Sequence, residues 1–137
     1  MARVYLDACM IIDLVEGSAE QQKALKMALK GQDIVSSELA RLESLIGALR
    51  SKHNAYLETY RKFFLGCTII SMDRAVFELA TDLRVQYAIK TPDALHLAAA
   101  LHGGCADFLT NDKRLAAAGG SHLNIVTWSD LGTSPGP

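Results

Sequence analysis

The sequence predicts an α/β protein in which a five-stranded parallel sheet carries helices on both faces. Short apolar segments suited to buried strands alternate with amphipathic helical segments along the whole chain, an order typical of parallel sheets with right-handed crossovers. The 137 residues suit one domain with a sizeable core, and no repeat, linker or low-complexity block divides them. We therefore expect one domain over residues 1–131, followed by a frayed tail over residues 132–137.

The first part of the chain predicts one strand and two helices. Residues 3–6 are β-branched and aromatic enough for a buried strand, and residues 8–15 follow as a short helical stretch. Ser18 caps the second helix, with Gln21 at the reciprocal position of a capping box, and Gly31 ends it.

The middle of the chain predicts a second strand and a helical hairpin. Residues 33–36 form the short strand, and Ser37 caps a helix that runs to about residue 51. A second helix over residues 54–64 carries a stripe rich in aromatic side chains. This stripe is more typical of a packing face than of a platform on which nucleic-acid bases stack, although such a face also suits a dimer contact or a bound peptide helix.

The last part of the chain predicts three strands separated by helices. Residues 67–70 form the third strand, and Ser71 caps a helix over residues 73–87. Thr91 caps the next helix, and Pro92 fits its first helical position because proline has no N–H to leave unpaired there. The chain closes with a strand, a short helix and a last strand, expected at residues 106–110, 114–118 and 123–127.

Composition narrows the class of protein. Half of the residues are apolar and 21% are charged, which is ordinary for a soluble globular protein. No apolar run approaches the ~20 residues of a membrane span, and an N-terminal segment containing Arg3 and Asp7 is unlike a signal peptide. The sequence has no Cys-x-x-Cys pair, which excludes a zinc ribbon, and we expect reduced thiols in a cytoplasmic protein at Cys9, Cys67 and Cys105.

Four acidic residues are expected to gather at one edge of the sheet. Asp7 ends the first strand, and Asp112 lies just past the fourth. Asp93 lies in the first turn of the helix before the fourth strand, and Glu43 lies within two turns of the start of the helix after the second strand. The carboxyl ends of parallel strands share one edge, where open α/β sheets bind their ligands. We therefore expect one site at this edge.

Each acid alone also has a structural interpretation. Asp7 and Asp112 can serve as N-caps, Asp93 can interact with the helix dipole, and Glu43 can pair with Arg50. Their joint arrangement favours a metal site, because hard divalent cations such as Mg²⁺ and Mn²⁺ prefer a few carboxylates plus water. Such a site suits phosphodiester hydrolysis. It suits acyl chemistry poorly, since no serine or cysteine has an evident histidine and acid partner.

Basic residues flank these acids although the chain as a whole is not basic. A formal net charge of −1 does not by itself indicate a nucleic-acid binder. Positive side chains placed around an acidic site would still hold a nucleic-acid backbone, and a solvated helix face is the alternative for each of them. The candidates for RNA contacts are Arg41, Arg50, Lys52, Lys90, Lys113 and Arg114.

The four acids lie in four segments of the sequence: YLDACMIIDL, SSELARLESL, TPDALHLAAAL and DFLTND. In this order the segments cover nearly the whole chain and resemble the PIN-domain ribonucleases, in particular the VapC-type toxins of bacterial toxin–antitoxin systems. The resemblance implies a three-layer α/β/α sandwich and an endoribonuclease that depends on Mg²⁺ or Mn²⁺. It implies catalytic and metal-binding roles, at positions that match the family motif, for Asp7, Glu43, Asp93 and Asp112. Thr110 and Asn111 in the last segment are expected to support this site.

The resemblance further implies a cytoplasmic toxin that inhibits translation by cutting a structured RNA, either tRNA or rRNA. A cognate antitoxin would restrain it, with a segment in the groove near the helical hairpin, and a homodimer is the expected assembly. No membrane attachment is expected. One departure from the family pattern is Cys9, where members often carry asparagine or serine. A thiol is a poor ligand for a hard cation, so we expect no direct metal contact from Cys9.

Two other functions fit parts of the pattern. A catalytically weak PIN module that binds RNA or a partner would keep the fold, and Cys9 is the sequence feature in its favour. A magnesium-binding receiver-like signalling domain also has an acidic pocket, but it needs an acceptor aspartate after a central strand and a lysine after a later one. Here the third strand is followed by Ser71, Met72 and Asp73, and no lysine ends the fifth.

Two residues near the acids are expected to have lesser roles. His96, one turn after Asp93, is expected on the helix face or behind the ligands, and not as a ligand itself. Asp130 is a weaker fifth candidate for the acidic edge.

Overall fold

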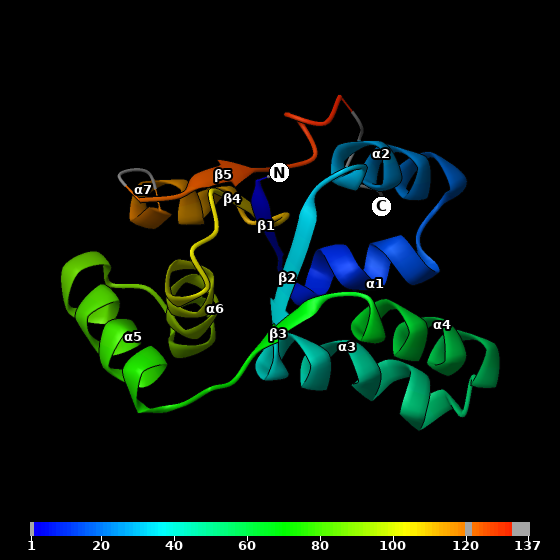
Figure 1. The fold of residues 1–137 in the computed structure, drawn as a ribbon, viewed down its shortest axis with the longest axis horizontal. Coiled ribbons are helices and arrows are strands. Elements are labelled where there is room, and N and C mark those ends of the chain that lie inside the picture. The colour runs from blue at the N-terminus through cyan, green and yellow to red at the C-terminus, as the bar shows by residue number, and fades with distance from the viewer. Residues whose placement is uncertain (1, 120–121, 133–137) are drawn as a thin grey trace.

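The computed structural model contains one sheet of five parallel strands (Figure 1). It describes residues 2–119 and 122–132, so most of the expected tail, residues 133–137, lies outside the described residues. The strands are β1 (Arg3–Leu6), β2 (Asp33–Ser37), β3 (Thr68–Ile70), β4 (Asp107–Leu109) and β5 (Asn124–Val126). All neighbouring pairs are parallel, which confirms the predicted sheet, and every strand end lies within one residue of its predicted position.

The strand order β3-β2-β1-β4-β5 places the first strand at the centre of the sheet. Val4 of β1 pairs with Ile34 of β2 on one side and with Asp107 of β4 on the other. The chain therefore leaves β1 toward β2 and later returns on the opposite side at β4. Where connections diverge in this way, a crevice opens at the carboxyl ends of the two strands, and open α/β sheets bind their ligands there.

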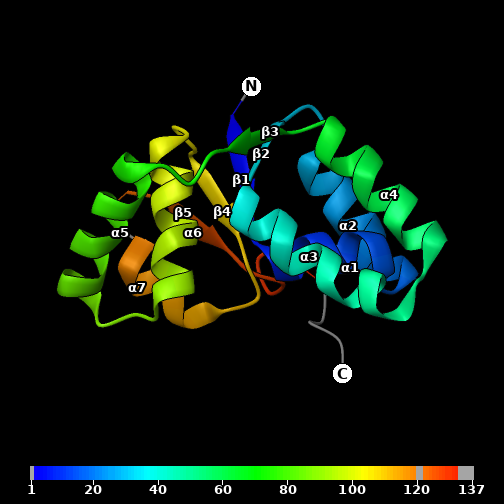
Figure 2. The same ribbon diagram turned by 90° about the horizontal axis from the view of Figure 1, so that it is seen from below.

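Successive strand residues face two opposite layers of helices. Tyr5 and Phe108 pack on one face, while Val4, Leu6 and Leu109 pack on the other. The first face is covered by α5 (Arg74–Tyr87), α6 (Thr91–His102) and α7 (Ala116–Gly119), which follows a 3₁₀ helix (Lys113–Leu115). The second is covered by α1 (Ala8–Glu16), α2 (Ala19–Leu29), α3 (Glu38–Ser51) and α4 (Asn54–Leu65). Figures 1 and 2 show the two layers on opposite sides of the sheet, which confirms the predicted α/β/α sandwich.

The cap of α5 differs from the prediction. The Asp73 carboxylate accepts a hydrogen bond from the Val76 amide at 3.2 Å, so Asp73 is the N-cap and the helix begins at Arg74. Ser71 lies two residues earlier, in the irregular segment after β3. Both residue types are good caps, and the chain path between β3 and α5 decides which one is used.

The start of α6 also differs from the prediction by one residue. The helix begins at Thr91, so Lys90 holds the N-cap position without a side-chain hydrogen bond, and Pro92 is the second helical residue. The Thr91 hydroxyl instead accepts a hydrogen bond from the Arg84 guanidinium at 2.9 Å. This contact ties the end of α5 to the start of α6. Thr91 does not cap the helix because it is itself a helical residue, whereas an N-cap residue has a non-helical backbone conformation.

The aromatic stripe of α4 is a packing face, as predicted. Tyr60 and Phe64 are buried, and the Tyr60 hydroxyl donates a hydrogen bond to the Glu16 carboxylate of α1. The hairpin of α3 and α4 is therefore held to α1 by apolar contacts and by this bond. In the part of the chain that the structure describes, no helix has the length and apolar character needed to cross a membrane.

Candidate metal-binding site

Asp7 lies at the carboxyl end of β1, where the strand order of the sheet changes direction. Its Oδ1 accepts a hydrogen bond from the Ala8 amide at 2.8 Å and caps α1. Its Oδ2 accepts a hydrogen bond from the Thr110 hydroxyl, also at 2.8 Å, just past β4. The start of α1 and the end of β4 thus fix one carboxylate oxygen each, so capping does not remove Asp7 from the site.

Thr110 connects Asp7 to the segment that carries Asp112. Thr110 is fully buried, and its hydroxyl oxygen accepts a hydrogen bond from the Asp112 amide at 3.2 Å. The Asp112 carboxylate accepts two hydrogen bonds from the Arg114 guanidinium, at 2.9 and 2.7 Å, and one from the Arg114 amide at 3.0 Å. These contacts hold the pKa of Asp112 below its usual range, so this acid is ionised at neutral pH.

Glu43 reaches the same edge from α3, and His96 meets it there from α6. His96 Nε2 lies 2.5 Å from Glu43 Oε1 and 3.5 Å from Asp7 Oδ1. Burial opposes the charged imidazole, but the hydrogen bond to Glu43 and the negative charge of Asp7 outweigh it and raise the pKa of His96. Asp7, Glu43 and His96 each place one ligand atom within 4.8 Å of the others, a spacing that a single metal ion can share. We call these three residues the Asp7–Glu43–His96 cluster.

Asp93 lies in the first turn of α6, one turn before His96. Burial raises the pKa of Asp93, and the negative charges of Asp112 and Asp7 raise it further. The part of this shift that comes from Asp112 and Asp7 shows that these carboxylates are close enough to repel Asp93. The four predicted acids therefore share one edge of the sheet, although only Asp7 and Glu43 belong to the cluster with His96.

His96 is closer to the acids than the sequence indicates. It is 3% exposed, in agreement with a place behind the ligands, but its hydrogen bond to Glu43 was not predicted. The spacing between Asp93 and His96 is a usable signal, because residues three apart lie on the same face of a helix. The position of Glu43 relative to that face depends on how α3 packs, which the sequence alone does not give.

Cys9 and Asp130 lie outside the cluster. Burial and the charge of Asp7 raise the pKa of the Cys9 thiol to about 12, so it stays protonated and is a poor ligand. The Asp130 carboxylate accepts hydrogen bonds from the Thr127 amide at 2.8 Å and hydroxyl at 3.2 Å, in the turn after β5. These bonds hold Asp130 in that turn, and its place as a fifth acid at this edge stays a prediction. Asn111, expected to support the site, is exposed.

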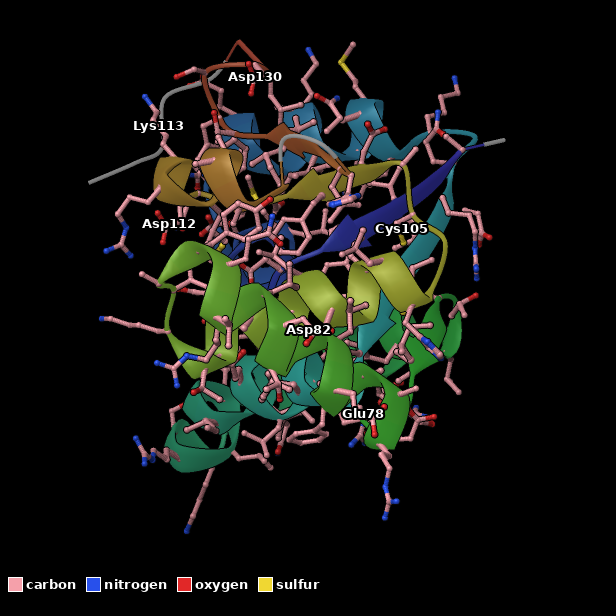
Figure 3. The ribbon with its side chains drawn as sticks, turned by 90° about the vertical axis from the view of Figure 1, so that its left-hand side faces the viewer. Glu78, Asp82, Cys105, Asp112, Lys113 and Asp130 are labelled. Atoms are coloured by element: carbon pink, nitrogen blue, oxygen red, sulfur yellow. The ribbon has the colours of Figure 1, made fainter. Side chains whose placement is uncertain are left out.

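Three of the predicted RNA-binding residues lie beside the acids. Lys90, Lys113 and Arg114 are exposed, and the charges of Arg114 and Lys90 contribute to the lowered pKa of Asp112. Figure 3 shows Asp112 and Lys113 at the same end of the strands, opposite the end at which Cys105 lies. The acidic edge thus has a positively charged rim.

The other three predicted RNA-binding residues lie on or just past α3. Arg41 is in its second turn, while Arg50 lies in its last turn and Lys52 holds its C-cap position. Glu43 is the sixth residue of α3, so Arg50 lies seven residues past it, about 10 Å along the helix axis, and Lys52 lies further. A role for Arg50 and Lys52 in holding RNA stays a prediction.

The donor atoms at this edge fit a hard divalent cation. Carboxylate oxygens of Asp7 and Glu43 converge, and Asp93 and Asp112 add negative charge beside them. Mg²⁺ and Mn²⁺ prefer such oxygen ligands, and Mg²⁺ retains several waters, so a loose set of acids suits it. A cation would also relieve the repulsion that contributes to the raised pKa of Asp93.

Comparison with known proteins identifies related folds. The family model of the PIN domain matches residues 4–121. A toxin–antitoxin complex from Klebsiella pneumoniae contains a chain that is 27% identical, with a TM-score of 0.73; the match covers 90% of this chain and 96% of that one. No curated protein sequence matches significantly.

Two further solved structures share the fold at lower identity. VapBC2 from Rickettsia felis, bound to a DNA fragment from its promoter, is 18% identical with a TM-score of 0.72, over 92% of this chain and 98% of that one. The toxin VapC20 from Mycobacterium tuberculosis, which cleaves the sarcin–ricin loop, is 17% identical with a TM-score of 0.68, over 85% and 95% of the two chains.

Proposed function

This chain belongs to the PIN domain family, and we propose that it is a metal-dependent endoribonuclease and the toxin of a toxin–antitoxin pair. Members of the family are generally nucleases, and the structural neighbours of this chain include toxins. The observation that carries the proposal is that Asp7 and Glu43 converge at the carboxyl ends of the neighbouring strands β1 and β4, with Asp93 and Asp112 beside them.

Asp7, Glu43, Asp93 and Asp112 would hold Mg²⁺ or Mn²⁺. When bound, such a cation would neutralise charge on the phosphodiester and make a nearby water a better nucleophile. Thr110 keeps one oxygen of Asp7 in place through its 2.8 Å hydrogen bond. Lys90, Lys113 and Arg114 of the positively charged rim would contact RNA phosphates, so RNA binding should weaken strongly as the salt concentration rises.

The proposed substrate is a structured RNA, tRNA or rRNA, whose cleavage inhibits translation. The neighbour from Mycobacterium tuberculosis, which has the same fold at 17% identity, is a toxin that cleaves the sarcin–ricin loop, and this supports the extension. We place the protein in the cytoplasm, where such RNA is found. A receiver-like signalling role is not favoured, because receiver domains have the strand order 2-1-3-4-5, whereas this sheet has the order β3-β2-β1-β4-β5.

A groove between α1, α2 and α4 is the proposed antitoxin contact. It has a volume of about 650 Å³. Its apolar lining includes Leu14, Ile34 and Phe63, and three lysines also line it, Lys26, Lys30 and Lys62. An amphipathic segment with acidic side chains would fit such a surface. The neighbour from Klebsiella pneumoniae is in a toxin–antitoxin complex, which supports an antitoxin partner here.

A homodimer is the proposed assembly. Helices α3 and α5 expose large apolar side chains, namely Leu42, Leu49, Phe77 and Val85, with exposed fractions of 57, 58, 50 and 84%. Covering such side chains on a second copy would remove apolar surface from water.

Cleavage of total bacterial RNA by the purified protein tests the proposed activity. We expect discrete cuts with Mg²⁺ or Mn²⁺, none with EDTA, and none with Asp7→Asn. Asp82→Asn is the matched control, because Asp82 is an exposed aspartate of α5 away from the acidic edge (Figure 3). Absence of cleavage by the folded wild-type protein, or equal cleavage by Asp7→Asn, would overturn the proposal and favour a role in binding RNA or a partner.

A further inference from the structure

We propose that His96 is the positioning residue of this site: it holds the Glu43 carboxylate beside Asp7, and Tyr5 and Ser37 hold His96 in turn. The inference rests on the proposed metal-dependent function and concerns how the chain itself orients one of the acids. It does not make His96 a ligand, because the ring nitrogen that faces the acids is already engaged by Glu43 at 2.5 Å.

The contact between His96 and Glu43 has a fixed direction. An ionised carboxylate can accept hydrogen bonds but cannot donate one. The hydrogen in this contact therefore lies on His96 Nε2, in both the neutral and the charged imidazole. The same nitrogen lies 3.5 Å from Asp7 Oδ1, between the two carboxylates. His96 therefore places one donor where two negative groups would otherwise face each other.

The other ring nitrogen of His96 is held by a buried chain of hydroxyl groups. His96 Nδ1 lies 2.8 Å from the Tyr5 hydroxyl, which lies 2.8 Å from Ser37 Oγ. Ser37 Oγ accepts a hydrogen bond from the Ala40 amide at 3.1 Å and so caps α3. Tyr5 is fully buried and stacks on Phe108 with ring centroids 5.1 Å apart, so its hydroxyl has little freedom to move.

These contacts link the end of β2, β1, α6 and α3 in a closed loop. Ser37 ends β2 and caps α3, Tyr5 is on β1, His96 is on α6, and Glu43 is on α3. The direction of the imidazole is thus fixed from the start of the helix that carries the acid it orients. A large movement of α3 away from α6 would break hydrogen bonds within this loop.

Glu43 depends on His96 more than Asp7 does. Asp7 has the Ala8 amide and the Thr110 hydroxyl as donors, one for each oxygen. Over residues 2–119 and 122–132, His96 is the only hydrogen-bond donor to the Glu43 side chain, which is 35% exposed. Without that donor, the three side-chain torsions of glutamate would let the carboxylate turn toward solvent and away from Asp7.

Partners that orient metal ligands typically change metal affinity by about 10–100-fold when they are removed. We therefore expect His96→Leu to weaken Mn²⁺ binding by about tenfold or more. His96→Gln should recover part of this loss, because its amide N–H can replace the donor to Glu43. Tyr5→Phe should cause a smaller loss, since it frees the imidazole but leaves the donor to Glu43 in place.

Isothermal titration of the metal-free proteins with MnCl₂ measures these affinities without depending on RNA cleavage. Tyr60→Phe is the matched control: Tyr60 is also fully buried and also donates to a carboxylate, that of Glu16, outside the acidic edge. We expect Tyr60→Phe to bind Mn²⁺ as the wild-type protein does, even where its unfolding temperature falls.

Each outcome of this titration decides between the two proposals. Equal or tighter Mn²⁺ binding by folded His96→Leu would overturn the role of His96 and leave the proposed function intact. No Mn²⁺ binding by the wild-type protein would overturn the metal-dependent function and the inference with it. If His96→Leu does not fold, His96→Gln and Tyr5→Phe decide. The inference would be overturned if Tyr5→Phe bound Mn²⁺ with wild-type affinity and His96→Gln lost no more Mn²⁺ affinity than the control Tyr60→Phe.

Discussion

Replacing Thr110 with valine removes one hydroxyl group and changes the shape of the side chain little. Thr110 is fully buried, and its hydroxyl donates to Asp7 Oδ2 and accepts a hydrogen bond from the Asp112 amide. The Asp7 side chain is only 15% exposed, so water replaces the lost donor poorly. Thr110→Val therefore leaves a charged oxygen and an amide without the partners that the folded protein gives them.

The expected loss of stability follows from these two hydrogen bonds. A hydrogen bond to a charged group contributes about 1.5–3 kcal/mol and a neutral one about 0.5–1.5 kcal/mol. Thr110→Val should thus lower the free energy of unfolding of the metal-free protein by roughly 2–4 kcal/mol. Mn²⁺ binding should also weaken, because Asp7 loses the contact that fixes one of its oxygens.

Urea unfolding in the presence of EDTA measures this change. Thr127→Val is the control: it loses one 3.2 Å hydrogen bond to Asp130, whose carboxylate keeps the Thr127 amide at 2.8 Å. This bond also goes to a carboxylate, but Asp130 is exposed and water can replace the lost donor, so we expect the control to lose about 1 kcal/mol or less. An equal loss in the two variants, or wild-type stability in Thr110→Val, would refute the idea that Thr110 fixes Asp7.

Three further predictions concern charge and backbone conformation. Asp93→Asn should raise the unfolding temperature of the metal-free protein at neutral pH and weaken Mn²⁺ binding in calorimetry; because folding raises the pKa of Asp93, the gain in stability should vanish at pH values below its unfolded-state pKa. Arg114→Ala should bind Mn²⁺ several-fold more tightly and RNA more weakly, since the guanidinium no longer competes for Asp112. Folding lowers the pKa of Asp112, so the stability that Arg114→Ala loses at neutral pH should fade as the pH falls through the folded-state pKa; unchanged Mn²⁺ affinity would contradict the competition. Ala88→Gly should stabilise the protein by about 0.5–1 kcal/mol in urea unfolding, because Ala88 has a left-handed φ of 45°.

The parallel sheet and the shared edge of the acids are predictable from sequence because they depend on alternation and on strand direction. Once residues 3–6 and 106–110 are assigned to parallel strands, Asp7 and Asp112 must follow their carboxyl ends, and the structure places them there. Helix α6 runs to the amino end of β4, so the first turn of α6, which carries Asp93, lies at the same edge as the carboxyl end of β4. The catalytic and metal-binding roles of these acids stay predictions.

Contacts that depend on packing between distant segments are not predictable in the same way. His96 meets Glu43 across 53 positions of sequence, and that contact needs the relative placement of α3 and α6. The bidentate hydrogen bond from Arg114 to Asp112 joins residues two positions apart, yet the sequence indicates only a nearby cation and not this geometry. The cap of α5 is similar, because Ser71 and Asp73 are both competent and the chain path selects one.

Crystals of the metal-free wild-type protein soaked in MnCl₂ would locate the cation directly by anomalous scattering. We expect one or more manganese peaks at the carboxyl ends of β1 and β4, bound by carboxylate oxygens that include those of Asp7 and Glu43. No peak at this edge, at a MnCl₂ concentration that supports RNA cleavage, would contradict a metal site there.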